Sequence, residues 1–478
     1  MNITSLTAAA LAVTGLVALT GPGGAPSGGR PDPAADRPTG RLVWGTCGRE
    51  DIQEGVECGR LTVPVDWSRP AGQQVALRAY RMKATGGPGR GTILNFPSGP
   101  GETGDIAFAT LRDRLPRYDL VALDPRGVGE SAPLRCATDR ILKIPLVPPT
   151  GQRAFEELAA GQRAFWSSCR TSPAAVKGHL DAVSNARDAE ALRAALKLDR
   201  VNLYGMSYGT LLAERYLGLF GRQVNGAVLE GVMDPARSRR SFVTSAAAAS
   251  EAVHDRFARW CARNKECVLH GKDLDATLRT AQRQADRGRV PGTAFGRPWS
   301  AAAVVQYVET ATGNADFAGA ARGLAALARG ANPDPDDGGG DQPVPKALPY
   351  ADPVVCSDFD LSVRDRASAA GDLEAARRAA PHLGYSTNAA QYTSICLNGP
   401  APAKGSGTPV VSRSAHPVML LSNTLDPSTP IAWADAVQRR LGPDTLHVRT
   451  DKVGHGGGLD VPDTRRRVAA YLDRLNRA

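Results

Sequence analysis

The sequence predicts an α/β fold in which a mostly parallel sheet is covered by helices on both faces and interrupted by a helical insertion. Short apolar runs rich in β-formers alternate with stretches of helical spacing, which is typical of parallel strands connected by helices. Between about residues 235 and 349 this alternation stops, and Ala- and Arg-rich helical patterns replace it. The 478 residues, of which 42% are hydrophobic, suffice for one large domain with such an insertion.

The first half of the chain supplies most of the predicted strands. Residues 60–67 and 74–81 alternate apolar and polar side chains, which predicts an antiparallel pair at a sheet edge. Apolar residues at helical spacing predict a helix over 184–196. Short apolar runs predict buried strands at residues 92–96, 118–124, 201–204 and 224–230.

The second half begins with the helical insertion and then returns to strands. Helices are predicted over residues 241–263, 274–287, 301–312 and 315–329, with no convincing strand among them, and an acidic loop is predicted over 332–341. Strand character resumes at 417–422 and 445–449, and an amphipathic helix over 464–475 follows. We interpret the insertion as a cap over one edge of the sheet, the alternative being a separate helical domain of unrelated purpose.

These elements predict four regions. Residues 1–40 are expected to be a signal peptide and flexible tail, 41–235 the first part of the α/β core, 236–350 the mainly helical cap, and 351–478 the C-terminal part of the core. The apolar run from Leu6 to Leu19 has the length of a signal-peptide core and is short for a membrane span. It lacks a preceding Lys or Arg, and no clear Ala-x-Ala site follows it. We therefore expect export without stable membrane insertion of the mature chain.

Cysteine usage also favours export. The eight cysteines form no Cys-x-x-Cys metal motif, and an even number in an exported chain indicates disulfides. Eight cysteines allow about 105 connectivities, among which the spacing favours sequential pairs. The favoured pairs are Cys47 with Cys58, Cys136 with Cys169, Cys261 with Cys267, and Cys356 with Cys396.

The net charge of +10 invites a nucleic-acid-binding interpretation. Lys and Arg are nevertheless dispersed among acidic residues, and no basic stripe is interleaved with aromatic residues. The densest basic cluster, Arg465 to Arg467, lies in the predicted C-terminal helix, where a solvated face explains it. We expect no nucleic-acid partner.

A nucleophile motif follows the predicted strand at 201–204. Gly205-Met206-Ser207-Tyr208-Gly209 stands between this strand and a helical run that begins near Leu211, which is the context of a nucleophile elbow. Such a turn would hold Ser207 in a strained backbone conformation, so a side chain at Gly205 or Gly209 would collide with a neighbouring strand or helix. The bare pattern also occurs in surface turns, so partners for a nucleophilic serine must be found elsewhere.

A base and an orienting carboxylate are predicted at the ends of the two late strands. Of the seven histidines, only His455 lies in a glycine-flanked loop directly after a late strand. Asp426 follows the preceding strand and is restricted by Pro427. Taken alone, Asp426 could cap the next helix and His455 could be a turn residue. The order Ser207, Asp426, His455 is nevertheless that of the α/β-hydrolase fold, which the sequence therefore predicts.

An oxyanion hole requires two N–H groups aimed at the developing negative charge. The backbone N–H of Tyr208 is one candidate, and Gly99, in the loop Pro97 to Gly101, is the other. Seen in isolation, this loop could equally be an ordinary tight turn.

Several motifs resemble the secreted tripeptidyl aminopeptidases of soil bacteria, which are relatives of prolyl iminopeptidases. The similarity runs from about Trp44 to the C-terminus and is strong at five motifs only. These are Pro97–Gly101, Asp124–Ser131, Gly205–Thr210, Leu425–Pro430 and Gly454–Gly456. Ser98 departs from the glycine usual in this family, which bears on the backbone angle at that position.

The resemblance implies that Ser207, Asp426 and His455 form a catalytic triad, with Gly99 and Tyr208 at the oxyanion positions. It also implies release of short peptides or single residues from free N-termini. A substrate ammonium in a closed site requires a carboxylate, because an unpaired buried charge is costly. Glu230, Asp234 and Asp358, the last in a Cys356-Ser357-Asp358 pattern seen in this group, are the candidates. Each could instead be a structural hydrogen-bond acceptor.

The sequence thus predicts a secreted serine exopeptidase, monomeric, acting on peptides through an acyl-enzyme, with no metal or organic cofactor required. A carboxylesterase or lipase would use the same triad, because esters and amides share the tetrahedral intermediate. A binding protein that kept the fold and lost the chemistry is the second alternative. Ser207 at the elbow excludes hydrolases with an aspartate nucleophile.

Overall fold

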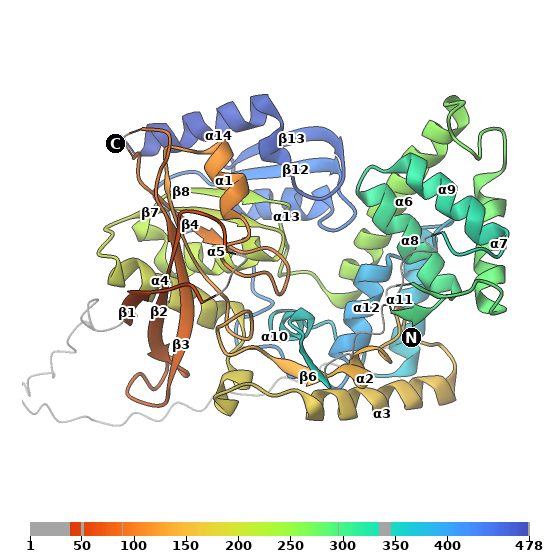
Figure 1. Ribbon diagram of the computed structural model, residues 1–478, viewed down its shortest axis with the longest axis horizontal. Helices are drawn as coiled ribbons and strands as arrows, with labels where there is room; N and C mark the ends of the chain where they lie inside the picture. The colour runs from red at the N-terminus through yellow and green to blue at the C-terminus, as the bar shows by residue number, and fades with distance from the viewer. Residues whose placement is uncertain (1–38, 49–51, 88, 295, 334–345, 477–478) are drawn as a thin grey trace, which may run out of the picture. The chain divides into compact units, whose positions relative to one another are not determined.

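The computed structural model describes residues 39–48, 52–87, 89–294, 296–333 and 346–476. The predicted signal peptide and most of the predicted acidic loop lie outside these residues. The described chain is built on a large mixed sheet with helices on both faces, as the sequence predicts (Figure 1).

Within the described residues the sheet has nine strands in the order β1-β2-β3-β5-β4-β7-β8-β12-β13. Strands β5, β4, β7, β8, β12 and β13 are parallel to one another, whereas β1, β2 and β3 join their edge in antiparallel fashion. Their bounds are Arg41–Gly45 (β1), Val56–Pro64 (β2), Gln74–Met82 (β3), Thr92–Phe96 (β4), Asp119–Leu123 (β5), Val201–Met206 (β7), Val224–Glu230 (β8), Met419–Leu425 (β12) and Leu446–Val453 (β13). The carboxyl ends of all the parallel strands therefore meet at one edge.

Two strand predictions gain detail from the structure. The predicted antiparallel pair is formed by β2 and β3 at one side of the sheet, where β1 adds a further, outermost strand by pairing with β2. Strand β13 continues to Val453, four residues beyond the predicted end of strand character at residue 449. In both cases hydrogen bonding to a distant strand extends the sheet where the local pattern is weak.

Alternate side chains of the central strands bury against opposite helical layers. Leu94, Leu203 and Leu229 pack in the cluster that contains α4 (Ala182–Ala195), α5 (Tyr208–Phe220) and α13 (Ile431–Leu441). Their neighbours Ile93, Tyr204 and Val228 pack against α1 (Phe108–Arg114) and α14 (Pro462–Leu475). Because side chains alternate along a strand, burial on both faces explains the continuous apolar runs in the sequence.

The four predicted helices of the insertion are present within a few residues of their predicted bounds. They are α6 (Arg239–Arg263), α7 (Leu274–Asp286), α8 (Ala301–Gly313) and α9 (Phe317–Ala328). Each is capped by a Ser or Asp that accepts a hydrogen bond from the backbone N–H three residues on: Ser238, Asp273, Ser300 and Asp316. The insertion has a separate apolar core, which includes Phe257, Leu278, Val304 and Leu324.

In the described part of the region that was predicted to lack strands, the structure has three short strands. Strands β9 (Thr293–Ala294) and β10 (Arg297–Pro298) pair with each other, and β11 (Ala347–Pro349) pairs with β6 (Arg135–Ala137). Strands of two or three residues carry no readable periodicity. Their pairing, and not their sequence, defines them.

The helices α6 to α9 form a helical lobe. Further helices of this lobe come from the chain after residue 350, which the sequence analysis assigned to the core. Helices α11 (Arg366–Ala379) and α12 (Thr387–Cys396) pack against α6, and Figure 1 shows them beside it. The short α10 (Val355–Asp358) packs against α12. The remaining helices of the described chain include α2 (Thr138–Ile141) and α3 (Gln152–Ser168).

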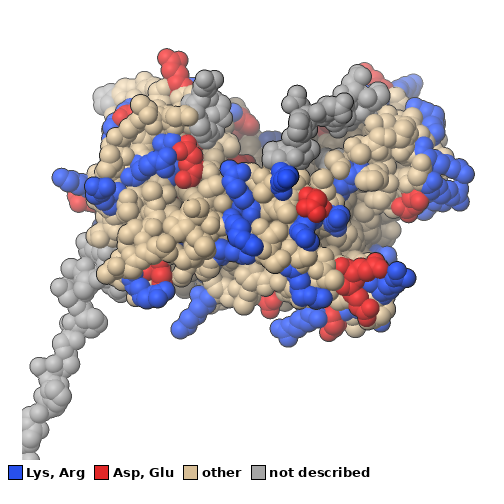
Figure 2. Space-filling model, turned by 60° about the horizontal axis from the view of Figure 1, so that its bottom comes forward, with Lys and Arg blue, Asp and Glu red and all other residues tan. Residues whose placement is uncertain are grey.

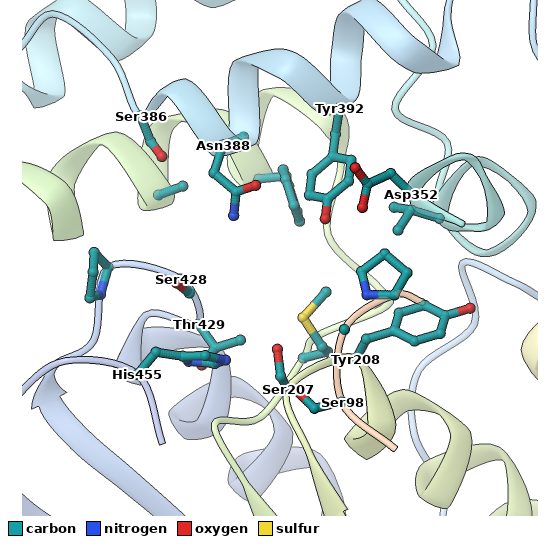
Figure 3. A pocket seen from close by; sticks show the side chains of 18 of the residues that line it. Ser98, Ser207, Tyr208, Asp352, Ser386, Asn388, Tyr392, Ser428, Thr429 and His455 are labelled. Atoms are coloured by element: carbon teal, nitrogen blue, oxygen red, sulfur yellow. The ribbon is translucent and has the colours of Figure 1, made fainter. Parts of the chain in front are cut away.

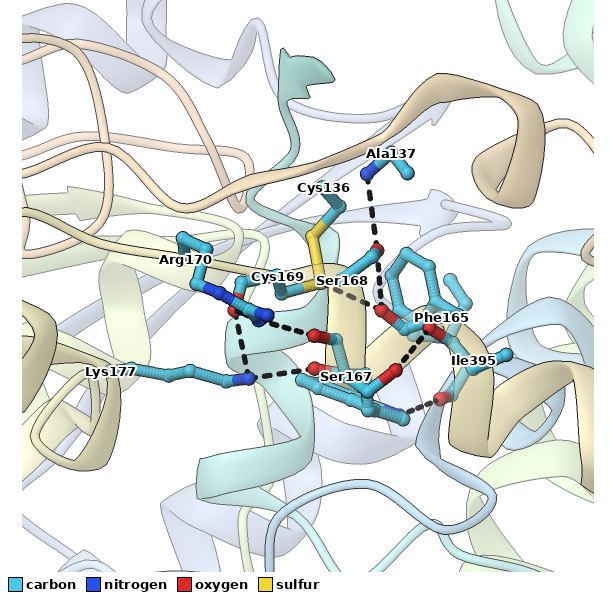
Figure 4. Close-up of a disulfide and its surroundings, with 11 residues drawn as sticks. Cys136, Ala137, Phe165, Ser167, Ser168, Cys169, Arg170, Lys177 and Ile395 are labelled. Atoms are coloured by element: carbon cyan, nitrogen blue, oxygen red, sulfur yellow. Dashed lines mark hydrogen bonds between the residues drawn. A yellow bond between two sulfur atoms is a disulfide. The ribbon is translucent and has the colours of Figure 1, made fainter. Parts of the chain in front are cut away.

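Four disulfides join the sequential pairs favoured by the cysteine spacing. Figure 4 shows one of them, Cys136–Cys169, which joins β6 to the end of α3. Lys177 Nζ donates to the carbonyl of Cys169 at 3.0 Å, and Trp166 Nε1 donates to the carbonyl of Ile395 at 3.0 Å. The bond thus lies where α3, α12 and the 170s segment meet.

Charged side chains of both signs are interspersed on the surface. Figure 2 shows Lys and Arg separated by acidic and uncharged residues on the face that it presents. In the Arg465–Arg467 cluster, Arg466 and Arg467 pair with Asp463 at 3.2 and 2.8 Å. Among the described residues, no helix combines the length and the apolar character needed to cross a bilayer.

Candidate active site

Ser207 occupies a strained turn between β7 and α5. Its φ of 55° and ψ of −126° lie outside the regions that ordinary residues adopt. A Cβ on Gly205 would lie 2.5 Å from the carbonyl oxygen of Gly209, and one on Gly209 would lie 2.3 Å from that of Phe96. Both positions therefore require glycine, and the tight turn exposes the Ser207 hydroxyl beyond the end of the sheet.

His455 and Asp426 meet in the loops that follow β13 and β12. The Nδ1 atom of His455 lies 2.9 Å from Oδ2 of Asp426 and 3.2 Å from Oγ1 of Thr429. The other oxygen of Asp426 accepts the backbone N–H groups of Ser428 and Thr429, each at 2.8 Å. These bonds fix the carboxylate and hold one nitrogen of the imidazole.

The charges around His455 favour its protonated form. Burial acts to lower the pKa of the imidazole, but the charge and hydrogen bond of Asp426 outweigh it, and Glu230 and Glu102 add to them. The pKa of His455 is thereby raised above its ordinary value. An imidazolium formed by proton transfer would be stabilised at this position.

Ser207 and His455 line one cavity of about 320 Å³. In Figure 3 the hydroxyl of Ser207 points up into this cavity and the ring of His455 lies beside it. Within the described residues the two groups face the same space without a direct hydrogen bond between them. Rotation of the serine about χ1 is the simplest movement that changes their separation.

The roof of this cavity comes from the helical lobe. Asn388 and Tyr392 of α12 reach down from above in Figure 3, and Phe242 and Ala246 of α6 also line it. A second cavity of about 300 Å³ shares Ser386, Asn388, Pro427, Ser428 and His455 with the first. The site is thus covered by side chains from far along the sequence.

Gly99 and Tyr208 lie in the wall of the cavity beside Ser207. Tyr208 is the first residue of α5, so its backbone N–H has no partner within the helix. Gly99 has a φ of 105°, and a Cβ there would lie 2.7 Å from the backbone nitrogen of Gly101. Ser98, which departs from the glycine of the resembling proteins, also lines the cavity.

Comparison with known families agrees with this geometry. The family described as alpha/beta hydrolase fold matches residues 91–460. The chain belongs to the α/β-hydrolase family. As a member with serine at the nucleophile elbow, it is a serine hydrolase.

Three curated relatives of this α/β hydrolase illustrate its neighbours. The tripeptidyl aminopeptidase of Streptomyces lividans is 26% identical over 90% of this chain and 84% of its own length. Carboxylesterase B of Mycobacterium tuberculosis is 30% identical over 87% of this chain and 86% of its own length. The serine protease Hip1 of Mycobacterium tuberculosis is 31% identical over 55% of this chain and 52% of its own.

Among solved structures, the proline iminopeptidase of Mycobacterium smegmatis is similar with a TM-score of 0.42 and 15% identity. The match covers 87% of this chain and 98% of that structure.

Glu230, Asp234 and Asp358 were expected to bind a substrate amine. Among the described residues, none of the three lines the cavity of Ser207 and His455, which we call the main cavity, and each has other partners. Asp234 pairs with Arg440 and Arg237, the latter at 3.2 Å. Asp358 accepts the Tyr208 hydroxyl at 2.5 Å and the backbone N–H of Ala182 at 2.8 Å. Burial raises the pKa of Asp358 to about 7. Glu230 also accepts two hydrogen bonds and is buried.

Glu102 and Asp352 are the carboxylates in the lining of the main cavity, within the described residues. Burial raises the pKa of both side chains, although the charge of His455 and the Ser98 N–H lower that of Glu102, and the Tyr350 hydroxyl lowers that of Asp352. Glu102 directly follows the Pro97–Gly101 loop, which is a signal that the sequence offered. Asp352 has no such signal, because only packing of the lobe brings it there.

Proposed function

We propose that this serine hydrolase is an exopeptidase that releases short peptides or single residues from free N-termini, of the tripeptidyl or prolyl aminopeptidase type. The observation that carries the proposal is the cavity shared by a strained Ser207 and by His455, whose Nδ1 lies 2.9 Å from Asp426. Relatives named tripeptidyl aminopeptidase and serine protease support peptides as the substrate class.

In the proposed reaction Ser207 is the nucleophile, His455 the base and Asp426 the residue that orients it. Because Nδ1–H of His455 donates to Asp426, the neutral ring presents an unprotonated Nε2 to the cavity. This nitrogen takes the proton of Ser207 and then delivers it to the leaving amine. The N–H groups of Gly99 and Tyr208 stabilise the oxyanion, and water completes hydrolysis of the acyl-enzyme.

Glu102 and Asp352 replace the three earlier candidates for binding the substrate ammonium. Glu102 is on the same loop as Gly99, and its charge acts on His455, so it lies near the reacting centre. Substitution Glu102→Gln is expected to raise KM for a peptide with a free N-terminus at least about tenfold, because a covered ammonium loses its counter-charge. Asp352→Asn, which removes the other carboxylate of the cavity lining, is the matched comparison. Equal KM values for all three proteins would refute an amine site at Glu102.

The proposed chemistry is tested by digesting a ladder of peptides with free or blocked N-termini and reading the products by mass spectrometry. Wild-type protein should shorten only the free peptides, and Ser207→Ala should fold normally and leave all of them intact. Unchanged turnover of peptide-naphthylamides by Ser207→Ala would refute the nucleophile.

A carboxylesterase is the second candidate, favoured by the 30% identity to a carboxylesterase over most of both chains. An esterase has no need of a free amine, so N-acetylation should leave its rates unchanged. Hydrolysis of simple esters with no cleavage of any peptide in the ladder would establish this alternative.

We further propose that residues 236–350, together with α11 and α12 from the following segment, form the cap through which substrate enters, and that residues 41–235 and the rest of 351–478 form the core. Secretion from the cell is proposed from the four disulfides, which persist in oxidising compartments. Protein recovered from culture medium should lack free thiols and begin after the predicted signal peptide. Full-length protein retained inside the cell would contradict export.

A further inference from the structure

Glu230 is the last residue of β8, which lies in the sheet between β7, the strand that leads to Ser207, and β12, the strand that leads to Asp426. Its backbone carbonyl accepts the N–H of Ser207 at 2.8 Å. Its side chain is buried, with 2% of the residue exposed. A buried carboxylate at this position needs an explanation, because desolvation opposes its charge.

The carboxylate of Glu230 connects two parts of the site. One oxygen accepts the hydroxyl of Tyr204, on the nucleophile strand, at 2.6 Å. The other accepts the backbone N–H of Gly458, three residues beyond His455, at 2.6 Å. A backbone N–H can only donate, so the ionised form of Glu230 suits both partners. Burial raises the pKa of Glu230, while these two donors and the charge of His455 lower it.

The loop held by Glu230 is rich in glycine and is also anchored by Lys452, whose Nζ donates to the carbonyls of Gly456 and Gly457 at 3.4 and 3.3 Å. Gly454, Gly456 and Gly457 all have positive φ values, of 111°, 67° and 69°, and glycine has more conformational freedom than any other residue. Asn423 also anchors this loop, and its side chain carries no charge. Its Nδ2 donates to the carbonyls of Gly454 and Gly456 at 2.7 and 2.8 Å.

The residue after Glu230 also shapes the seat of the imidazole. A Cβ on Gly231 would lie 3.1 Å from Cε1 of His455 and 2.9 Å from Oγ1 of Thr429. The corner formed by Glu230 and Gly231 therefore sets both the space beneath the ring and the position of its loop. The charge of Glu230 also raises the pKa of His455.

We propose that Glu230 is a positioning residue for hydrolysis: its carboxylate ties the His455 loop to the nucleophile strand and stabilises the imidazolium that forms when His455 takes the serine proton. The proposal rests on the proposed Ser207–His455–Asp426 chemistry. It assigns Glu230 no contact with substrate, and it replaces the amine-binding role predicted from the sequence.

The test uses Glu230→Gln, which keeps the shape of the side chain and removes its charge. The readout is the rate of Ser207 labelling by a fluorophosphonate as a function of pH, which needs His455 but no knowledge of the natural substrate. Labelling requires neutral His455, so it is lost as the pH falls through the pKa of that ring. Removing a nearby negative charge lowers this pKa, so the acid limb should move to lower pH by about one unit. The maximal rate should fall at least about tenfold.

Asn423→Ala is the matched control, because it loosens the same loop without changing charge. It should slow labelling while leaving the acid limb at its wild-type pH. Glu230→Asp keeps the charge but is one methylene shorter, so the limb should stay and the rate should fall. If Glu230→Gln fails to fold, as judged by circular dichroism, a wild-type labelling rate in Glu230→Asp would overturn the proposal.

A folded Glu230→Gln protein with an unmoved acid limb, or with the wild-type rate, would overturn the positioning role. Failure of the wild-type protein to label at Ser207 would instead overturn the proposed function, and this inference with it. The two failures are therefore distinguishable in one experiment.

Discussion

Replacing Asp426 by asparagine should disable the base while leaving its surroundings in place. One oxygen of Asp426 accepts two backbone N–H groups, from Ser428 and Thr429 at 2.8 Å each, and only a carbonyl oxygen can replace it there. The NH₂ group that Asp426→Asn introduces must then occupy the position of the oxygen that lies 2.9 Å from Nδ1 of His455. An NH₂ group donates, so Nδ1 has to be unprotonated and the proton moves to Nε2. In that tautomer the ring cannot take the proton of Ser207.

The expected loss in kcat is about ten-thousandfold, the size of effect typical when a triad carboxylate is changed to its amide. The assay compares kcat for a peptide-naphthylamide in wild type and Asp426→Asn, with thermal melting as the control for folding. Ser207→Ala supplies the background rate. A folded Asp426→Asn enzyme within about tenfold of wild type would show that the carboxylate does not set the tautomer, and the mechanism would then be wrong.

Three other substitutions, the first with its own control variant, test the surrounding structure. Gly209→Ala should cut kcat about a hundredfold or more, because its methyl group would lie 2.3 Å from the carbonyl oxygen of Phe96 and displace the N–H groups that we propose for the oxyanion hole. Gly161→Ala, whose added methyl group has open space around it, should leave kcat unchanged. Asp188→Ala should lower the free energy of unfolding by about 3–5 kcal/mol in urea titrations, because it leaves the buried guanidinium of Arg126, now 2.6 Å from Asp188, without its counter-charge; a change below about 1 kcal/mol would contradict this. Asp358 has a folded pKa of about 7, above its ordinary value, so the folded state binds more protons than the unfolded state between those values. The free energy of unfolding of the wild type should therefore fall relative to that of Asp358→Asn as the pH rises from about 4 to 7. If the free energies of the two proteins changed in parallel with pH, the raised pKa of Asp358 would be wrong.

The parts of the site that the sequence could identify are those whose geometry is local. The strand, turn and helix around Ser207 follow one another directly, and Gly205 and Gly209 are required by contacts within this motif and with the adjacent strand β4. Asp426 and His455 each follow a strand, so a parallel sheet brings them to the same edge. Their meeting follows from chain order once the fold class is known.

The remaining features depend on packing between distant segments, which no short pattern encodes. Asp352 and Tyr392 reach the cavity only because the chain after residue 350 returns to pack on α6. Glu230 is the last residue of the buried strand β8 and Asp234 lies four residues further on, so the sequence offers two carboxylates close together. One is bonded to Tyr204 and Gly458 and the other to Arg440, and these partners decide their roles.

The Cys356–Cys396 bond fastens the last residue of α12 to α10, the helix that follows the short turn holding Asp352. Asn388 and Tyr392, also on α12, lie above Ser207 in the cavity (Figure 3). The disulfide therefore links the roof of the cavity covalently to the segment that carries Asp352 in its wall. The disulfide holds the cavity at a constant size while the lobe undergoes local fluctuations. Thiol reductants should therefore weaken substrate binding before they unfold the sheet.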